Sequence, residues 1–279
     1  MTLQELELKA FEIRKLIIDT THHAGMGHVG GSLSETELLT VLFFEVMNID
    51  INNPSWDDRD RFVLSKGHCT PGYYSTLALR GFFPLETLRT FDELGTILQG
   101  HPDMHKTPGI DISSGSLGQG LSCGIGMALG RKALGKSFYT YVLMGDGESQ
   151  EGQVWEAALY AGSNKVTHII GITDDNKVQL AATTKETLNI EPIADKWKVF
   201  GWDVIECDGH NISELVDTLN KAKTLSLKTP VMIIAHTVKG KGIDFMENRW
   251  EWHGKAPNDE EFRKALNCLE LTRQQNNHD

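Results

Sequence analysis

Short apolar runs recur along the chain, and the segments between them have the periodicity of helices. Five runs are continuous rather than alternating, which is typical of strands buried on both faces of a parallel sheet. They are 61–65, 139–144, a run around Ile169 that ends at Asp174 and Asp175, 202–207 and 231–235. This alternation predicts an α/β fold with a parallel sheet of about five strands flanked by helices. No linker or repeat interrupts it, so we expect one domain over residues 1–279.

The first helical segments have recognisable starts and stops. Apolar residues at helical spacing predict a helix over 3–23, and the glycine-rich stretch 22–31 predicts a loop after it. Ser34, with Glu37 three positions later, is typical of a capping box, which predicts a second helix up to about Met47.

Three later segments complete this outline. The glycines around Gly118 predict a small-residue helix that runs to about Gly130, but their spacing is not that of a dinucleotide-binding loop and no acidic residue follows at the ribose position. A crossover helix is expected over 211–223. The polar tail after Glu270 is expected to fray.

Composition narrows the function classes. The net charge of −11 and the pI of about 5.5 argue against nucleic acid as a partner, because phosphate binding needs a basic face. No apolar run approaches the length of a membrane span, and the acidic N-terminus is unlike a signal peptide. The four cysteines are far apart and lack a metal-binding pattern, so we expect free thiols in the cytoplasm.

Two polar residues follow neighbouring apolar runs. Asp146, within Gly145-Asp146-Gly147, comes after the run 139–144, and Asn176 comes after the next run. Parallel neighbours would bring both side chains to one sheet edge, where oxygen ligands suit Mg²⁺, or Ca²⁺, together with a diphosphate. Gly147 would let the backbone approach a phosphate, and a helix that opens near Ser149 would offer N–H groups to it. Taken alone, Gly-Asp-Gly is also typical of an ordinary turn.

Histidines form a second pattern. A glycine precedes His28, His68 and His101, and His253 lies within Trp-His-Gly. Because histidine titrates near neutral pH, these side chains are candidates for proton transfer. Without further context, His28 could equally be a surface loop residue.

Together these motifs resemble the thiamine diphosphate signature, and in particular the N-terminal domain of transketolases. The resemblance runs from His28 to His253. It implies metal ligands at Asp146, Asn176 and the backbone carbonyl of Val178. It implies cofactor contacts at His68, Gly115, Ser116, Leu117, Asp146, Gly147, Asn176, Leu180 and His253, with Gly115 and Leu117 facing the aminopyrimidine and Leu180 wedging the bent cofactor.

The resemblance also implies roles in transfer of a two-carbon ketol unit from a ketose to an aldose. His28 and His253 are expected to move a proton at the donor C3 hydroxyl, and His68 and His101 to orient the C1 hydroxyl. Glu151 is expected to join a carboxylate network, with a shared proton, across the interface between two subunits.

A full transketolase continues into a pyrimidine-binding domain and a C-terminal domain, which the sequence lacks. The resemblance therefore implies the N-terminal subunit of a split transketolase, completed by a second chain that carries the pyrimidine-binding domain and its catalytic glutamate. We expect this chain to form a dimer, and a two-plus-two assembly (α2β2) with its partner. The candidate contact face comprises 118–130 and 151–161, with Trp155 as its anchor.

Alternatives remain at this point. A deoxyxylulose-phosphate synthase or a ketoacid dehydrogenase α chain would share Gly-Asp-Gly, and the missing domains would suit a non-catalytic cofactor-binding module. The sugar stays open among the usual sugar phosphates and branched or sulfonated ketoses, because the missing domains grip the far end of the donor.

Overall fold

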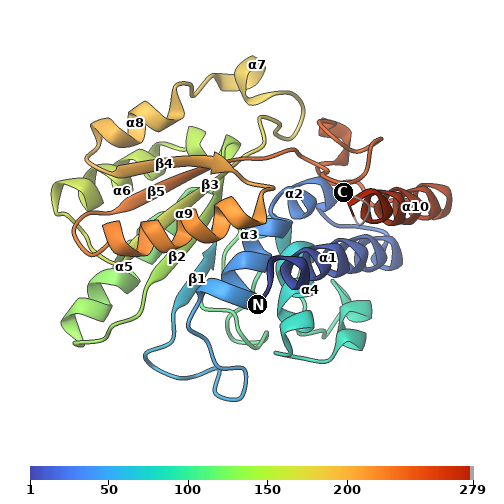
Figure 1. Cartoon of the computed structure of the whole chain (residues 1–279), viewed down its shortest axis with the longest axis horizontal. Coiled ribbons are helices and arrows are strands. Elements are labelled where there is room, and N and C mark those ends of the chain that lie inside the picture. Colours follow the sequence, from blue (N-terminus) through green and yellow to red (C-terminus); the bar gives the residue numbers. More distant parts are fainter. Residues whose placement is uncertain (277–279) are drawn as a thin grey trace.

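The computed structural model describes residues 1–276, and the expected parallel sheet is present (Figure 1). Its five strands are all parallel, in the order β1-β2-β3-β5-β4. Their bounds are β1 (Arg61–Leu64), β2 (Thr140–Gly145), β3 (Ile169–Asp175), β4 (Asp203–Asp208) and β5 (Val231–His236). The prediction of about five parallel strands is therefore confirmed.

Helices cover both faces of the sheet, and alternate strand residues point to each layer. On β1, Phe62 and Leu64 belong to one apolar cluster and Val63 to the other. The first cluster includes side chains of α1 (Leu3–Ala24), α3 (Thr36–Val41), α4 (Thr70–Arg80) and α9 (Ile212–Leu225). The second includes α5 (Gln119–Ala133), α6 (Gly152–Ser163) and α8 (Ile193–Val199). Burial on both faces explains why β1, β2, β3 and β5 read as continuous apolar runs, whereas the edge strand β4 is largely exposed or half-buried.

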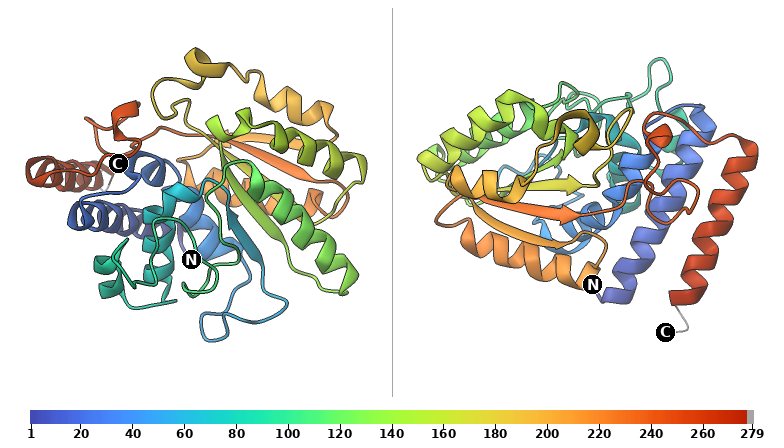
Figure 2. Two further views of the ribbon diagram at one scale, coloured as in Figure 1. Left: turned by 180° about the vertical axis from the view of Figure 1, so that it is seen from behind. Right: turned by 90° about the horizontal axis from the view of Figure 1, so that it is seen from above.

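A third apolar cluster lies beside the sheet, where α1 packs against α10 (Asp259–Asn276) (Figures 1 and 2). It also contains Val29 and Leu33 of α2 (Val29–Ser34). The expected fraying after Glu270 is wrong as far as Asn276, because α10 continues to that residue; residues 277–279 lie outside the described part. The remaining helix is α7 (Thr184–Leu188).

Two local predictions near α2 are wrong. The loop over 22–31 ends at His28, because Gly30 and Gly31 lie inside α2. A Cβ on Gly31 would lie 2.6 Å from Cys69 Sγ, so this glycine serves close packing rather than a loop. Ser34 does not cap the next helix: its hydroxyl donates to the Gly31 carbonyl (2.9 Å) and to Asp174 Oδ2 (2.5 Å).

A tertiary hydrogen bond to a buried carboxylate has thus replaced the local cap. The predicted second helix up to about Met47 is nevertheless present: it begins at Thr36, and its last turn, Leu42–Val46, is a π-helix. Among residues 1–276, no helix is long and apolar enough to cross a membrane.

Candidate active site

The carboxyl ends of β2 and β3 lie side by side and carry the first two candidate residues. The strands pair in register, with Gly145 opposite Asp174, so Asp146 and Asn176 follow adjacent strand ends. The prediction that these two residues follow neighbouring parallel strands is confirmed. The edge of the sheet thus has the geometry at which α/β folds bind ligands.

Asp146 is a buried carboxylate that is held by backbone donors. Its Oδ1 accepts from the N–H of Gly147 (2.7 Å), and its Oδ2 accepts from the N–H of Lys177 (2.6 Å). Burial, followed by the charge of Asp174, raises the pKa of Asp146 to about 7. A divalent cation at this carboxylate would offset both effects, so the site fits a cation.

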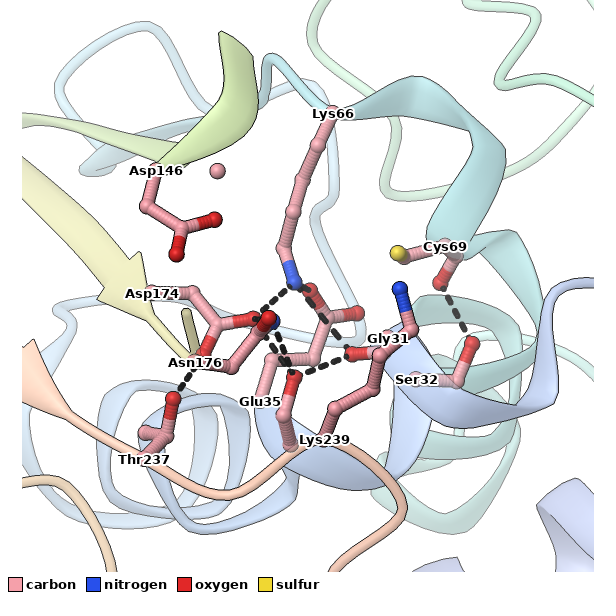
Figure 3. Close-up of polar contacts among 12 residues, drawn as sticks. Gly31, Ser32, Glu35, Lys66, Cys69, Asp146, Asp174, Asn176, Thr237 and Lys239 are labelled. Carbon is pink, nitrogen blue, oxygen red and sulfur yellow. Dashed lines mark hydrogen bonds and ion pairs between the residues drawn. The ribbon is translucent and has the colours of Figure 1, made fainter. Parts of the chain in front are cut away.

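Asn176 and Val178 lie in the turn that is held to Asp146 by the hydrogen bond from the Lys177 N–H. The Asn176 amide donates from Nδ2 to Asp174 Oδ2 (3.1 Å), and its Oδ1 accepts from the N–H of Val178 (3.1 Å) (Figure 3). Within residues 1–276, no three His, Cys, Asp or Glu side chains are placed to hold a metal ion. A cation here would therefore depend on amide and carbonyl oxygens beside Asp146.

A buried ion network lies under this turn (Figure 3). The Nζ of Lys66 lies 2.5 Å from Asp174 Oδ2, 2.8 Å from Glu35 Oε2 and 3.2 Å from the carbonyl of Gly31. Burial raises the pKa of Glu35 to about 8 although Lys66 opposes the shift. Burial also raises the pKa of Asp174, but the contacts with Lys66 and with hydroxyl donors lower it by more. The pKa of Asp174 therefore lies below its ordinary value.

The sequence analysis assigned no role to this network. Lys66 directly precedes the Gly67-His68 pair, so its position after a strand was an available signal. The sequence contains no such signal for Glu35, because glutamate is an ordinary residue in a predicted helix.

Three of the four candidate histidines meet at one point. The ring centroids of His28, His68 and His253 lie 4.9 to 5.3 Å apart. Burial lowers the pKa of His68 to about 2 and that of His253 to about 3, and it also lowers the pKa of His28. The cluster is therefore neutral at physiological pH, and each ring can accept a hydrogen bond at one nitrogen and donate one from the other.

His101 lies at the rim rather than in this cluster. It is exposed and, together with His28, lines a hollow of about 700 Å³. Gly115 packs against its ring: a Cβ there would lie 2.9 Å from His101 Cδ2, and the φ of +152° also favours glycine. The following residues, Ser116 and Leu117, are exposed at the start of α5.

Lys239 is a buried lysine for which the sequence predicted no role. Its Nζ lies 2.8 Å from His253 Nδ1 and donates to the carbonyl of Val178 (3.1 Å). Burial lowers the pKa of Lys239 to about 8. Because the ammonium donates to Nδ1, neutral His253 carries its proton on Nε2.

The remaining candidates lie at the surface or require correction. Leu180 is 68% exposed, and Glu151 is exposed just before α6. The helix expected near Ser149 begins at Gly152, after a 3₁₀ turn over Gly147–Gln150. Trp155 is not a free anchor, since its indole stacks on Phe200 and lies tilted against Trp197, and its Nε1 donates to the Ser149 carbonyl (2.9 Å).

Comparisons with known proteins agree with this geometry. The family model for the transketolase thiamine diphosphate-binding domain matches residues 7–276. The chain is 46% identical over 272 residues to the 6-deoxy-6-sulfo-D-fructose transketolase subunit SqwG of a Clostridium species (strain MSTE9), covering 97% of this chain and 98% of the relative. It is 40% identical over 266 residues to an apulose-4-phosphate transketolase subunit of Phocaeicola vulgatus, covering 95% of this chain and 94% of that relative.

Solved transketolases have the same fold over a longer chain. The Campylobacter jejuni enzyme superimposes with a TM-score of 0.90 at 31% identity, over 97% of this chain and 43% of that one. The fold and the Gly-Asp-Gly turn thus define a thiamine diphosphate-binding α/β domain. The chain belongs to the transketolase family, of which it represents the N-terminal, cofactor-binding part.

The low pKa of His68 predicts an acid-sensitive fold. Its pKa is about 2 in the folded chain and ordinarily 6.5, so its contribution to stability is complete above pH 6.5 and is lost as the pH falls toward 2. We expect His68→Gln to reduce, by about one, the number of protons taken up on unfolding between pH 6.5 and 5. Urea unfolding at several pH values in this range gives the slope of the free energy of unfolding against pH, which measures this proton uptake. Identical slopes for the variant and the wild type would contradict the prediction.

Proposed function

We propose that this chain is the N-terminal subunit of a two-chain transketolase, which transfers a two-carbon ketol unit from a ketose to an aldose. The observation that carries the proposal is the buried Asp146 turn at the carboxyl edge of the sheet, among buried neutral histidines. The matched relatives that are named as transketolase subunits support the two-chain form, because this chain covers 94% to 98% of their length.

The donor groups at the sheet edge suit Mg²⁺ and thiamine diphosphate. Asp146, Asn176 and the carbonyl of Val178 would hold Mg²⁺, with Ca²⁺ as a substitute. Thiamine diphosphate, when bound, supplies the nucleophilic carbon that takes the two-carbon unit. The residues that would contact it are His68, Gly115, Ser116, Leu117, Gly147, Leu180, Lys239 and His253.

The histidines of this chain would handle the protons of the sugar. Neutral His28 can accept a proton from the donor C3 hydroxyl. His253 carries its own proton on Nε2 while Lys239 donates to Nδ1, so it is better suited to donate a hydrogen bond there. His68 and His101 would orient the C1 hydroxyl, and Glu151 would face a carboxylate of another subunit.

For the substrate we propose an anionic ketose. The names of the two relatives contain 6-deoxy-6-sulfo-D-fructose, which is a sulfonated ketose, and apulose 4-phosphate, which is a sugar phosphate. This chain is 46% identical to the first relative and 40% identical to the second. A sulfonated ketose is thus the first candidate donor, and a ketose phosphate, including those of the pentose phosphate pathway, is the second. We place the enzyme in the cytoplasm because all four cysteines are free thiols.

We further propose that the chain dimerises and binds its partner in a two-plus-two assembly. Helices α5 and α6 contact each other on one face of the sheet, and their outer surface includes Leu159 and Tyr160, which are 54% and 50% exposed. Since Trp155 is used inside the chain, these two residues are better anchors for the dimer contact.

Activity should require both chains. The purified chain with thiamine diphosphate and Mg²⁺ should show no transketolase turnover, because the catalytic glutamate lies on the partner, and adding a chain with the pyrimidine-binding domain should create turnover. A coupled assay with sulfofructose and with fructose 6-phosphate as donors also ranks the two substrate classes. Full turnover by the single chain would contradict the two-chain proposal.

The cation site is tested by Asp146→Ala. Removing the carboxylate should weaken Mg²⁺-dependent binding of thiamine diphosphate on the order of 100-fold, because the diphosphate loses its bridging cation. Calorimetry on the two-chain complex measures the affinity, and Asp217→Ala, which removes an exposed carboxylate of α9, is the matched control. Unchanged affinity in Asp146→Ala would mean that Gly-Asp-Gly is only a turn.

The proposed dimer contact is tested by Tyr160→Glu. An unpaired charge buried in the contact is costly, so the variant should remain a monomer when alone. Its thermal unfolding should stay close to that of wild type, because the side chain is half exposed in the single chain. Light scattering measures the mass, with Tyr160→Phe as the control; a variant that still dimerises would exclude this face.

A further inference from the structure

Glu148 is a buried carboxylate that the mechanism does not use. It is 3% exposed and follows Gly147 in the 3₁₀ turn. Its Oε1 accepts from the hydroxyl of Ser65 (2.5 Å) and from the N–H of Gly118 (2.8 Å). Its Oε2 accepts from the N–H of Gly145 (3.1 Å). One side chain therefore joins three separate segments.

Each of these segments leads directly into a part of the cofactor site. Ser65 follows β1 and precedes Lys66, Gly67 and His68. Gly118 ends the loop that carries Gly115, Ser116 and Leu117, and Gly145 ends β2 immediately before Asp146. The carboxylate thus contacts all three segments: the end of β1 that leads to His68, the loop over Gly115–Leu117, and the turn that carries Asp146.

The chemistry of the three partners requires a carboxylate. All three are donors here, and an ionised carboxylate is an acceptor at both oxygens. Glutamine has the same shape, but its NH₂ group would face either the Gly145 N–H or the pair of Ser65 and Gly118 donors. In the described structure no ion pair involves Glu148, so these hydrogen bonds compensate its burial.

The segments have little room to move once they are joined. A Cβ on Gly120 would lie 2.3 Å from Ser65 Oγ, and one on Gly118 would lie 2.9 Å from Glu151 Cβ. Gly118 also has a φ of +84°, which favours glycine. The start of α5 is therefore pressed against the end of β1, and a shift of one would displace the other.

We propose that Glu148 is a positioning residue, which holds the β1 end, the Gly115–Leu117 loop and the Asp146 turn in register for the cofactor. The inference rests on the proposed function. Loss of a residue that orients the ligands of a site typically costs about 10- to 100-fold in affinity, so losing this contact should be visible in cofactor binding.

The test compares Glu148→Gln with Asp60→Asn in the two-chain enzyme. Asp60 is also a buried carboxylate, 2% exposed, and accepts from the N–H groups of Asn48 (2.9 Å) and Tyr139 (2.8 Å) at the opposite ends of β1 and β2. Both variants should unfold at a lower temperature. Only Glu148→Gln should raise the calorimetric Kd for thiamine diphosphate, by about 10- to 100-fold.

A kinetic split adds a readout that stability alone does not move. In Glu148→Gln the KM for thiamine diphosphate should rise at least about tenfold, while kcat at saturating cofactor falls by less than about threefold. If this variant does not fold, Ser65→Ala, which removes one donor and keeps the carboxylate, should raise the Kd by about three- to tenfold.

Two outcomes overturn the inference alone. One is an unchanged Kd for thiamine diphosphate in Glu148→Gln, or in Ser65→Ala if Glu148→Gln does not fold. The other is an equal rise of this Kd in Asp60→Asn. A wild-type complex that binds no thiamine diphosphate would overturn the proposed function itself, and this inference with it. Wild-type binding with equal binding by Glu148→Gln would overturn only the role of Glu148.

Discussion

The contact between Lys66 and Asp174 is the interaction on which the site depends. Asp174 is the next-to-last residue of β3 and is fully buried. Its carboxylate accepts from four groups: Ser34 of α2, Lys66 after β1, Asn176 after β3 and Thr237 after β5. A buried carboxylate without its cation is strongly destabilising, so these segments are fixed relative to one another. The Asp174 carboxylate therefore positions both Asn176 and the segment after β1 that leads to His68.

Around that pair, burial favours the neutral form of several titratable groups. It disfavours the doubly protonated, charged form of the histidines and the ionised form of Glu35 and Asp146. A cation held at Asp146 would favour the ionised form of that carboxylate. Charge can therefore enter the site with the metal and diphosphate, while the surrounding rings stay available for hydrogen bonding.

The sequence predicted what depends on strand order and strand ends. Asp146 and Asn176 could be placed together because each follows a continuous apolar run, and such runs pair in parallel. The cap at Ser34 failed because a local signal lost to a tertiary bond with Asp174. Glu35 and Lys239 could not be assigned, since only the folded chain brings Glu35 to Lys66, and Lys239 to His253 and Val178.

The glycines show the same division. Gly31 was read as a loop signal because glycine disfavours helices, yet the structure uses its missing side chain to bring α2 against Cys69. Trp155 was read as a contact anchor from its type alone, and its contact with Trp197 depends on a separate helix, α8, that lies far along the chain. Packing between distant segments is not written in a local pattern.

The histidine cluster brings together the two ends of the chain, because His28 precedes β1 and His253 follows β5 in the sequence. During synthesis the residues of all five strands have been made once His236 is added, and His253 is added later. The last contacts to form are then long-range ones, which carry a large entropic cost of chain closure and slow folding. A nascent chain can therefore finish its sheet while its chemistry is still unassembled.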